Sequence, residues 1–234
     1  MTKGTGSSGP EARYISVQDV EYELATGCAR TFRKHLLTTE RLEIRQTLIR
    51  RGGDTETYGA CATDTAAYVL AGTAVLENQD RTQVGKGQLL VIPAGARWGE
   101  QLSLLSDELV LLEVARAGAR PASSNEPAAP IHAVNPEDVQ PYEPAGHAKT
   151  QNRCLFVDEY VEIILGMIDR GGGAERHSHR DNEQLLYVLG GVGVPLLIYY
   201  PKGAPHGTGG GIAEPLELLV IYSPPLGESQ NALG

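Results

Sequence analysis

Apolar residues occur along most of the chain in short runs, each ended by glycine, proline or another turn-forming residue. Many runs are rich in β-branched and aromatic residues, and turn signals recur about every 8–12 residues, which is typical of an all-β sandwich or barrel. The pattern predicts two β-barrels of the jelly-roll type, with helical turns only at Pro136–Val139 and near Val17–Tyr22. The clearest predicted strands are Leu42–Ile49, Ala66–Leu70, Leu89–Ile92, Leu109–Val114, Val161–Ile168, Gln184–Leu189, Pro195–Tyr200 and Leu216–Tyr222.

The composition is that of a globular protein, since 41% of the 234 residues are hydrophobic and 21% are charged. The net charge is −9 and no basic stripe is present, which argues against a nucleic-acid partner. Three widely spaced cysteines, Cys28, Cys61 and Cys154, predict free thiols in a reducing compartment. No apolar run approaches 18 residues and no signal pattern opens the chain, so we expect a cytoplasmic protein without membrane contact.

An internal duplication is the most informative feature. A shift of 119 positions places residues 18–72 on residues 137–191 without a gap, and identities recur in order along this stretch. Examples are Arg51–Glu56 on Arg170–Glu175 and Tyr68–Gly72 on Tyr187–Gly191. Two copies of one unit therefore follow each other along the chain.

The second copy is shorter than the first. Pro93, Gly95 and Trp98 align with Pro201, Gly203 and His206 at a shift of 108, so 11 residues are missing between Gly191 and Pro201. Either a hairpin has been shortened or a mobile loop is absent from this sequence, and in both cases one side of the second unit should be open or flexible there. We predict a disordered tail at 1–14, a metal-free N-terminal barrel at 15–114, a linker at 115–135, a metal-binding C-terminal barrel at 136–226 and a tail at 227–234.

Four ligand-type residues gather in the second copy. His177 and His179 are two apart, so both imidazoles face the same way if they lie on a strand. Glu183 follows a polar turn at the start of the next strand, where a hairpin can return its carboxylate beside the histidines. His206 lies on a third segment after a Pro-Lys-Gly turn. Three neutral imidazoles and one carboxylate suit a first-row transition metal with open positions for water or substrate.

Here the sequence resembles the cupin superfamily, whose motifs are G-x5-H-x-H-x3–4-E-x6-G and a segment ending P-x-G-x-x-H. The matching residues are Gly171, His177, His179, Glu183, Gly190, Pro201, Gly203 and His206. A glycine expected six residues before the proline is replaced by Pro195. Because the resemblance covers both halves of the chain, the chain looks like a bicupin, a protein with two tandem cupin units. The resemblance implies that the two histidines, the glutamate and the later histidine bind one divalent ion inside the second barrel.

The first copy lacks this ligand set, because Tyr58, Ala60, Asp64 and Trp98 occupy the four positions. One carboxylate cannot hold a divalent ion in a largely apolar barrel, so the first barrel should be metal-free. It would serve for stability, for docking or for covering the mouth of the second barrel. Its two aromatic residues either fill the vacated cavity or form a ligand cradle.

Two further residues are candidates for catalysis. Period-two alternation puts Glu175 on the face of His177 and His179, as a partner of the ligands, a general acid/base or a strand-end charge. Tyr187 shares a face with Glu183, so its hydroxyl either enters the pocket or packs in the core. No role is predicted for His147.

The ligand set favours an enzyme that acts on a small organic substrate chelating the ion. A non-haem iron dioxygenase is preferred, because three imidazoles suit Fe(II), although Mn, Ni and Zn also fit. The alternatives are a Lewis-acid isomerase, cyclase, lyase or decarboxylase, and a small-molecule-binding protein without turnover. A homodimer is compatible with exposed barrel edges.

Overall fold

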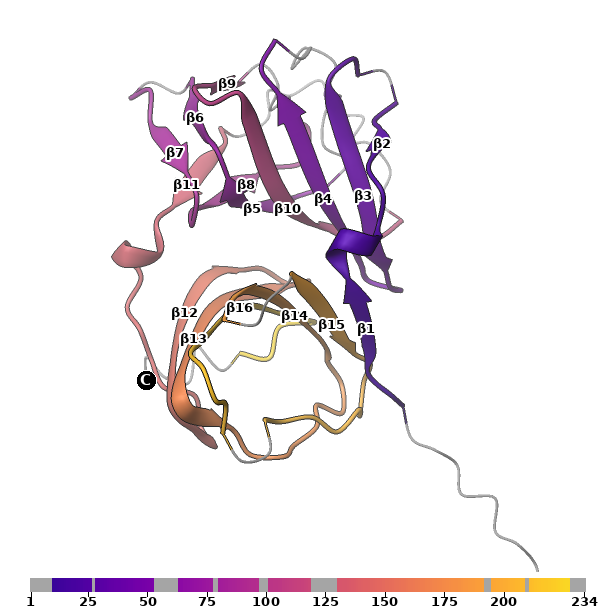
Figure 1. Cartoon of the computed structure of the whole chain (residues 1–234), viewed down its shortest axis with the longest axis vertical. Helices are drawn as coiled ribbons and strands as arrows, with labels where there is room; N and C mark the ends of the chain where they lie inside the picture. The colour runs from indigo at the N-terminus through magenta and orange to yellow at the C-terminus, as the bar shows by residue number, and fades with distance from the viewer. Residues whose placement is uncertain are drawn as a thin grey trace, which may run out of the picture. The chain divides into compact units, whose positions relative to one another are not determined.

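The structure is a computed structural model whose named elements are strands and two single 3₁₀ turns (Figure 1). The chain divides into two compact units: an N-terminal unit, Gln18–Val139, and a C-terminal unit, Met1–Val17 with Gln140–Gly234. The structure describes residues 10–26, 28–52, 63–77, 80–96, 101–118, 130–191, 195–208 and 211–227.

The N-terminal unit contains two antiparallel sheets. The larger has the order β11-β8-β5-β10-β4-β3-β2, and the smaller has the order β7-β6-β9. Buried aliphatic residues such as Val69, Leu90 and Leu111 form its core. The strands are β2 (Glu23–Leu24), β3 (Thr31–Thr38), β4 (Leu42–Arg50), β5 (Thr65–Ala71), β6 (Thr73–Leu76), β7 (Gln83–Gly85), β8 (Leu89–Ile92), β9 (Leu102–Leu104), β10 (Glu108–Arg116) and β11 (His132–Val134).

The C-terminal unit contains one antiparallel sheet of order β1-β15-β14-β16-β13-β12, which curls around the interior of the unit (Figure 1). Alternate residues of its strands turn inward, and Ile164, Val188, Leu218 and Val220 are among those packed in the core. The strands are β1 (Arg13–Ser16), β12 (His147–Val157), β13 (Glu162–Ala174), β14 (Glu183–Gly190), β15 (Leu196–Tyr200) and β16 (Leu216–Ser223).

Two short strands occupy equivalent places in the duplication. β1 pairs with β15, with Arg13 opposite Tyr199, and β11 pairs with β8, with His132 opposite Val91. Residues 13–16 fall on residues 132–135 at the shift of 119, so each unit is completed by the strand that precedes the other unit in the chain. The structure thus differs from the predicted boundaries: residues 13–16 are neither tail nor part of the N-terminal unit, and β11 lies within the segment predicted as linker.

The predicted strands are confirmed as β4, β5, β8, β10, β13, β14, β15 and β16, each within two residues of its expected ends except that β13 continues to Ala174. The predicted helical turns are confirmed as 3₁₀ turns η1 (Val17–Asp19) and η3 (Pro136–Asp138). The Asn135 side chain accepts a hydrogen bond from the Glu137 N–H and so begins η3. Hydrophobic periodicity was therefore a guide to these eight strands but not to short ones such as β1 and β11.

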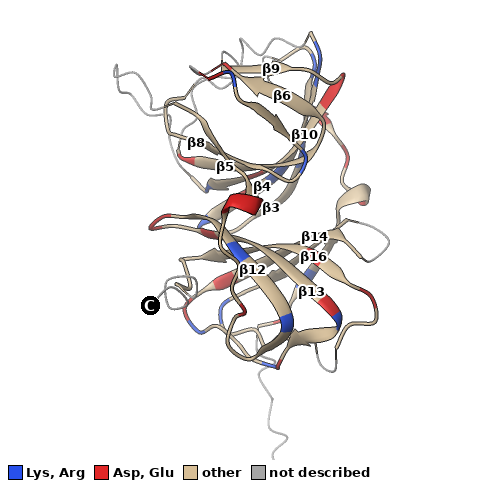
Figure 2. Ribbon diagram, turned by 90° about the vertical axis from the view of Figure 1, so that its left-hand side faces the viewer, with Lys and Arg blue, Asp and Glu red and all other residues tan. Residues whose placement is uncertain are grey.

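In the view of Figure 2, basic residues of the described segments are spread among acidic ones over both units rather than gathered along one face. No helix in the described segments is long and apolar enough to cross a membrane.

Candidate metal centre

Two backbone segments carry the three motif histidines. His177 and His179 lie between β13 and β14, outside a regular strand, whereas the sequence placed them on one; His206 lies between β15 and β16. The His177 N–H donates to the His206 carbonyl at 2.9 Å, and the His206 N–H donates to the His177 carbonyl at 2.9 Å. The Gly203 N–H also donates to the His179 carbonyl, at 2.7 Å. These hydrogen bonds hold the two segments antiparallel and side by side.

Gly207 permits this close pairing, because it follows His206 and lies against the backbone that leads into His177. Its φ is +147°, a conformation that residues with a side chain rarely adopt. A Cβ at this position would lie 2.8 Å from the Glu175 carbonyl oxygen and 3.0 Å from the Arg176 Cα. Glycine is therefore required where the two histidine segments meet.

The three imidazoles converge. Ring centroids are 4.3 Å apart for His177 and His206, 4.9 Å for His177 and His179, and 5.0 Å for His179 and His206. One ligand nitrogen from each of the three rings lies within 4.8 Å of the other two. Within the described residues, no other group of three or more histidine, cysteine, aspartate or glutamate ligand atoms comes together in this way. Nitrogens at these separations can share one ion.

Backbone carbonyls orient two of the rings. The Nδ1 atom of His177 lies 2.7 Å from the Glu175 carbonyl oxygen, and that of His206 lies 2.9 Å from the Ala204 carbonyl oxygen. Because a carbonyl only accepts, a neutral ring donates from Nδ1 and keeps its lone pair on Nε2. The Nε2 atoms of His179 and His206 are buried and have no hydrogen-bond partner in the described structure. Free lone pairs of this kind fit coordination of a metal ion.

The surroundings of two of the imidazoles, His179 and His206, favour their neutral form. Burial, followed by repulsion from His177, His206 and His147, lowers the pKa of His179 from 6.5 to about 4. Burial likewise lowers the pKa of His206, although its hydrogen bond to Ala204 acts in the opposite direction. Metal ions bind the neutral imidazole, so these rings are ready to coordinate at neutral pH. Imidazole donors suit Fe, Ni, Cu and Zn.

Glu183 does not join the histidines, although the sequence predicted it as the fourth ligand. It begins β14 as expected, but its side chain is 4% exposed and accepts a hydrogen bond from the Tyr199 hydroxyl at 3.2 Å. The cavity beside the histidines is lined instead by Gln184 and its alternate neighbours Leu186 and Val188. Glu183 thus lies on the opposite face of the strand.

The two predicted catalytic residues also lie away from the cavity. Glu175 is exposed, and its backbone carbonyl rather than its carboxylate contacts His177. Tyr187 is 2% exposed on the face of Glu183, so it packs in the core and does not line the cavity. Neither residue is among those that line the cavity beside the cluster.

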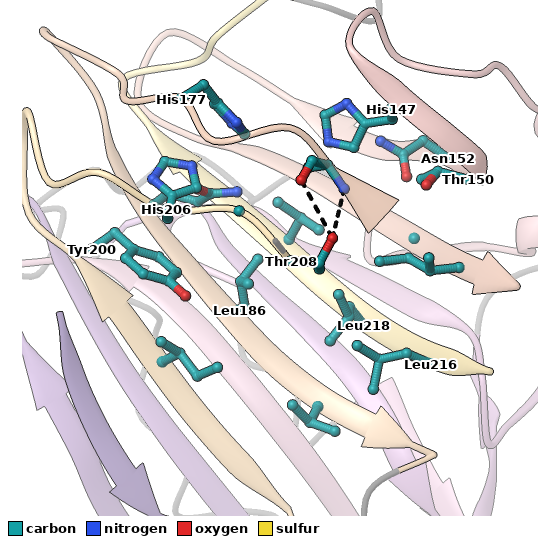
Figure 3. Close-up of a pocket in the computed structure, with 18 of the residues that line it drawn as sticks. His147, Thr150, Asn152, His177, Leu186, Tyr200, His206, Thr208, Leu216 and Leu218 are labelled. Atoms are coloured by element: carbon teal, nitrogen blue, oxygen red, sulfur yellow. Dashed lines mark hydrogen bonds between the residues drawn. The ribbon is translucent and has the colours of Figure 1, made fainter. Parts of the chain in front are cut away.

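A cavity of about 220 Å³ lies beside the histidines, within the C-terminal unit. Figure 3 shows His177, His206 and Tyr200 grouped along its rim, with Leu186, Leu216 and Leu218 below them in the view. Its walls are mostly aliphatic, because β14, β15 and β16 turn alternate apolar residues inward. The space suits the apolar body of a small ligand whose head group reaches the rim.

His147, to which the sequence assigned no role, stands at the same rim beside Thr150 and Asn152 (Figure 3). Its ring lies 5.8 Å from that of His177 in a T-shaped arrangement, and its Nδ1 lies 3.0 Å from the Ala145 carbonyl oxygen. These three residues of β12 add a polar corner to an apolar cavity. No spacing in the sequence ties His147 to the other histidines, so only the fold could reveal it.

The counterpart positions of the N-terminal unit are largely outside the described residues, including Tyr58, Ala60 and Trp98. Asp64 is described, and its carboxylate accepts a hydrogen bond from the Ala94 N–H at 2.8 Å. The carboxylate therefore ties the start of β5 to the loop after β8.

No protein-family model matches the chain, and no curated protein matches it in sequence. Solved structures nevertheless share its fold over almost the whole length. A candidate dioxygenase from Nostoc punctiforme is 15% identical with a TM-score of 0.70, over 94% of this chain and 85% of that one. A candidate glyoxylate-induced protein from Pseudomonas aeruginosa is 15% identical with a TM-score of 0.66, over 95% and 91%.

The oxalate decarboxylase of Lactobacillus farciminis, solved as a formate complex, is 13% identical with a TM-score of 0.63, over 94% of this chain and 87% of that one. At such identities the likeness shows a common fold alone. The chain is an all-β protein with the fold of these proteins.

Proposed function

We propose that the chain is a metal-dependent bicupin enzyme, with two tandem jelly-roll barrels of which the C-terminal one binds the ion. Its substrate is a small organic molecule that chelates the metal. The observation that carries the proposal is the convergence of three imidazoles, two of them with buried and unpartnered Nε2 atoms, beside an apolar cavity that His177 and His206 line.

Each part of the cavity has a separate task in this proposal. His177, His179 and His206 hold the ion, and the carbonyls of Glu175 and Ala204 keep two of the rings in the coordinating tautomer. The aliphatic walls exclude water and bind the apolar body of the substrate. The polar corner of His147, Thr150 and Asn152 donates and accepts hydrogen bonds around the substrate head group.

A bound divalent transition ion would supply either activation of O2 or polarisation of a substrate carbonyl. We favour a non-haem iron dioxygenase, because a set of imidazole donors suits Fe(II) and the apolar walls keep water from the reacting groups. The fold shared with a candidate dioxygenase supports this choice. The fold shared with an oxalate decarboxylase supports the second candidate, a Lewis-acid lyase or decarboxylase.

Metal content and oxygen uptake test the proposal together. The full chain is purified without oxygen, its bound metal is measured, and it is reloaded with Fe(II), Mn(II), Ni(II) or Zn(II). His177→Ala and His206→Ala should lose the metal, while His35→Ala, a change of an exposed histidine in the other unit, should retain it. Unchanged metal content in His177→Ala and His206→Ala would refute the metal site.

The class of reaction is tested by measuring substrate conversion and oxygen uptake when the metal-loaded protein is mixed with catechols, diketones and hydroxy acids. Oxygen uptake in step with substrate loss supports the dioxygenase. Conversion without oxygen uptake replaces it with the Lewis-acid enzyme, and tight binding without conversion under every metal replaces both with a binding protein.

A further inference from the structure

Gln184 is the polar member of the β14 residues that line the cavity, since the others are Leu186 and Val188. Its side chain is 6% exposed, and its Nε2 donates to the Tyr222 hydroxyl at 3.0 Å. The Tyr222 ring in turn lies 5.2 Å from the His179 ring, and Gln184 lines the same cavity as His177 and His206. The Gln184 Oε1 atom is buried and has no hydrogen-bond partner in the described structure. A buried carbonyl oxygen without a donor is costly unless something binds it.

Glu183 cannot take this place without a change of register. Its carboxylate lies on the other face of β14, where the Tyr199 hydroxyl donates to it. A slip of one residue would bring it inward, but the same slip would replace Leu186 and Val188 in the cavity with Leu185 and Tyr187 and would break the observed pairing with β15 and β16.

We propose that Gln184, through Oε1, is the fourth protein ligand of the ion, so that three imidazoles and one amide oxygen hold it. This inference rests on the proposed metal-dependent function and refines its ligand set. The spacing agrees with it: the motif that the chain resembles allows three or four residues after the second histidine, and the longer spacing ends at Gln184, with Gly191 at the required distance beyond.

The identity of the fourth ligand decides the charge of the site. Imidazoles and an amide are all neutral, so a divalent ion keeps its full charge inside a cavity with apolar walls, whereas a carboxylate would cancel part of it. Electrostatic attraction is strong in such surroundings, and an anionic group binds there more tightly than a neutral one. The substrate class that follows is a small chelator with an anionic head, such as a carboxylate, an enolate or a catecholate.

Four variants test the ligand assignment. Gln184→Leu removes the amide at nearly constant volume, Gln184→Glu introduces a carboxylate, Glu183→Gln is the matched control on the neighbouring residue, and His206→Ala tests the metal site itself. Co(II) affinity and the visible spectrum of the Co(II) protein are measured for each, and the thermal midpoint of the metal-free protein reports folding. Binding of 4-nitrocatechol to the Co(II) protein reports the preference for an anionic head.

Gln184→Leu should weaken Co(II) binding about tenfold or more and change the Co(II) spectrum, because loss of even an outer contact of a ligand costs that much. Glu183→Gln should stay within about twofold of the unchanged protein. Gln184→Glu should bind Co(II) more tightly and 4-nitrocatechol at least tenfold more weakly. If Gln184→Leu does not fold, the outcome with Gln184→Glu decides.

Three results would overturn the inference, and they are distinguishable. Loss of Co(II) in Glu183→Gln with retention in Gln184→Leu would make the glutamate the ligand. Unchanged binding in both, together with loss in His206→Ala, would mean that histidines alone hold the ion and the proposed function stands. Retention of Co(II) in His206→Ala would remove the metal site and the proposed function with it.

Discussion

Replacing Gly207 with alanine should push apart the two backbone segments that present the histidines. The new Cβ would meet the Glu175 carbonyl oxygen at 2.8 Å and the Arg176 nitrogen at 3.1 Å. Both are backbone atoms, so no side-chain rotation relieves the contact, and the segments must separate. Separation weakens the paired hydrogen bonds between His177 and His206, each 2.9 Å long.

The size of the effect follows from these contacts. Alanine in a left-handed conformation costs about 1–2 kcal/mol, and weakening two backbone hydrogen bonds adds about 1 kcal/mol for each. Gly146→Ala is a matched control in the same unit, because Gly146 has a φ of +73° with nothing within 4 Å of a built Cβ. The control carries a conformational cost, smaller than at Gly207, without the backbone contacts, so the two variants should differ by at least about 2 kcal/mol, or about thirtyfold in an equilibrium constant.

Amide hydrogen exchange of the metal-free protein measures this difference locally. The His177 and His206 amides should exchange about thirtyfold faster in Gly207→Ala than in Gly146→Ala, and Co(II) affinity should fall about tenfold or more only in the former. Equal exchange and equal affinity in the two variants would show that the glycine contact does not position the histidines.

Three other outcomes are expected. The unfolding free energy of the metal-free protein should decrease as the pH falls from 6.5 to about 4, because the unfolded chain protonates His179 before the folded chain does. Urea unfolding midpoints measured across this pH range should show the decrease. An equal decrease in His179→Gln would contradict the prediction. Leu186→Phe should fill the cavity and weaken binding of 4-nitrocatechol about tenfold, while Co(II) affinity stays within about twofold. An equal loss of 4-nitrocatechol affinity and Co(II) affinity would mean that the residue supports the metal site instead. Glu162→Gln should lower the unfolding free energy by about 2 kcal/mol, because the fully buried carboxylate accepts hydrogen bonds from the Leu226 and Gly227 N–H groups. An unchanged thermal midpoint would show that these hydrogen bonds do not contribute to stability.

The C-terminal cluster illustrates how far sequence motifs reach. His177, His179 and His206 were identified from their spacing, and the structure brings all three together. Their spacing is informative because alternate residues of an extended segment face the same way, and a turn can return a third segment beside them. His147 carried no comparable signal, since it reaches the rim only because β12 passes there.

The sequence by itself determined where eight of the strands lie and which histidines form a cluster, because both depend on local periodicity and spacing. It could not determine which face of β14 turns inward. Both faces of that strand are apolar beyond its first two residues, so alternation groups Glu183 with Tyr187 and Gln184 with Leu186 but does not say which group faces the cavity.

Only pairing with β15 and β16 decides the face of β14, because a register is fixed by the neighbouring strands and their packing. The pairing of β1 with β15 is likewise invisible in the sequence, since it joins residues from opposite ends of the chain. Contacts between segments that are distant in sequence belong to the tertiary structure, and here they separate Glu183 from the histidines and set Gln184 beside them.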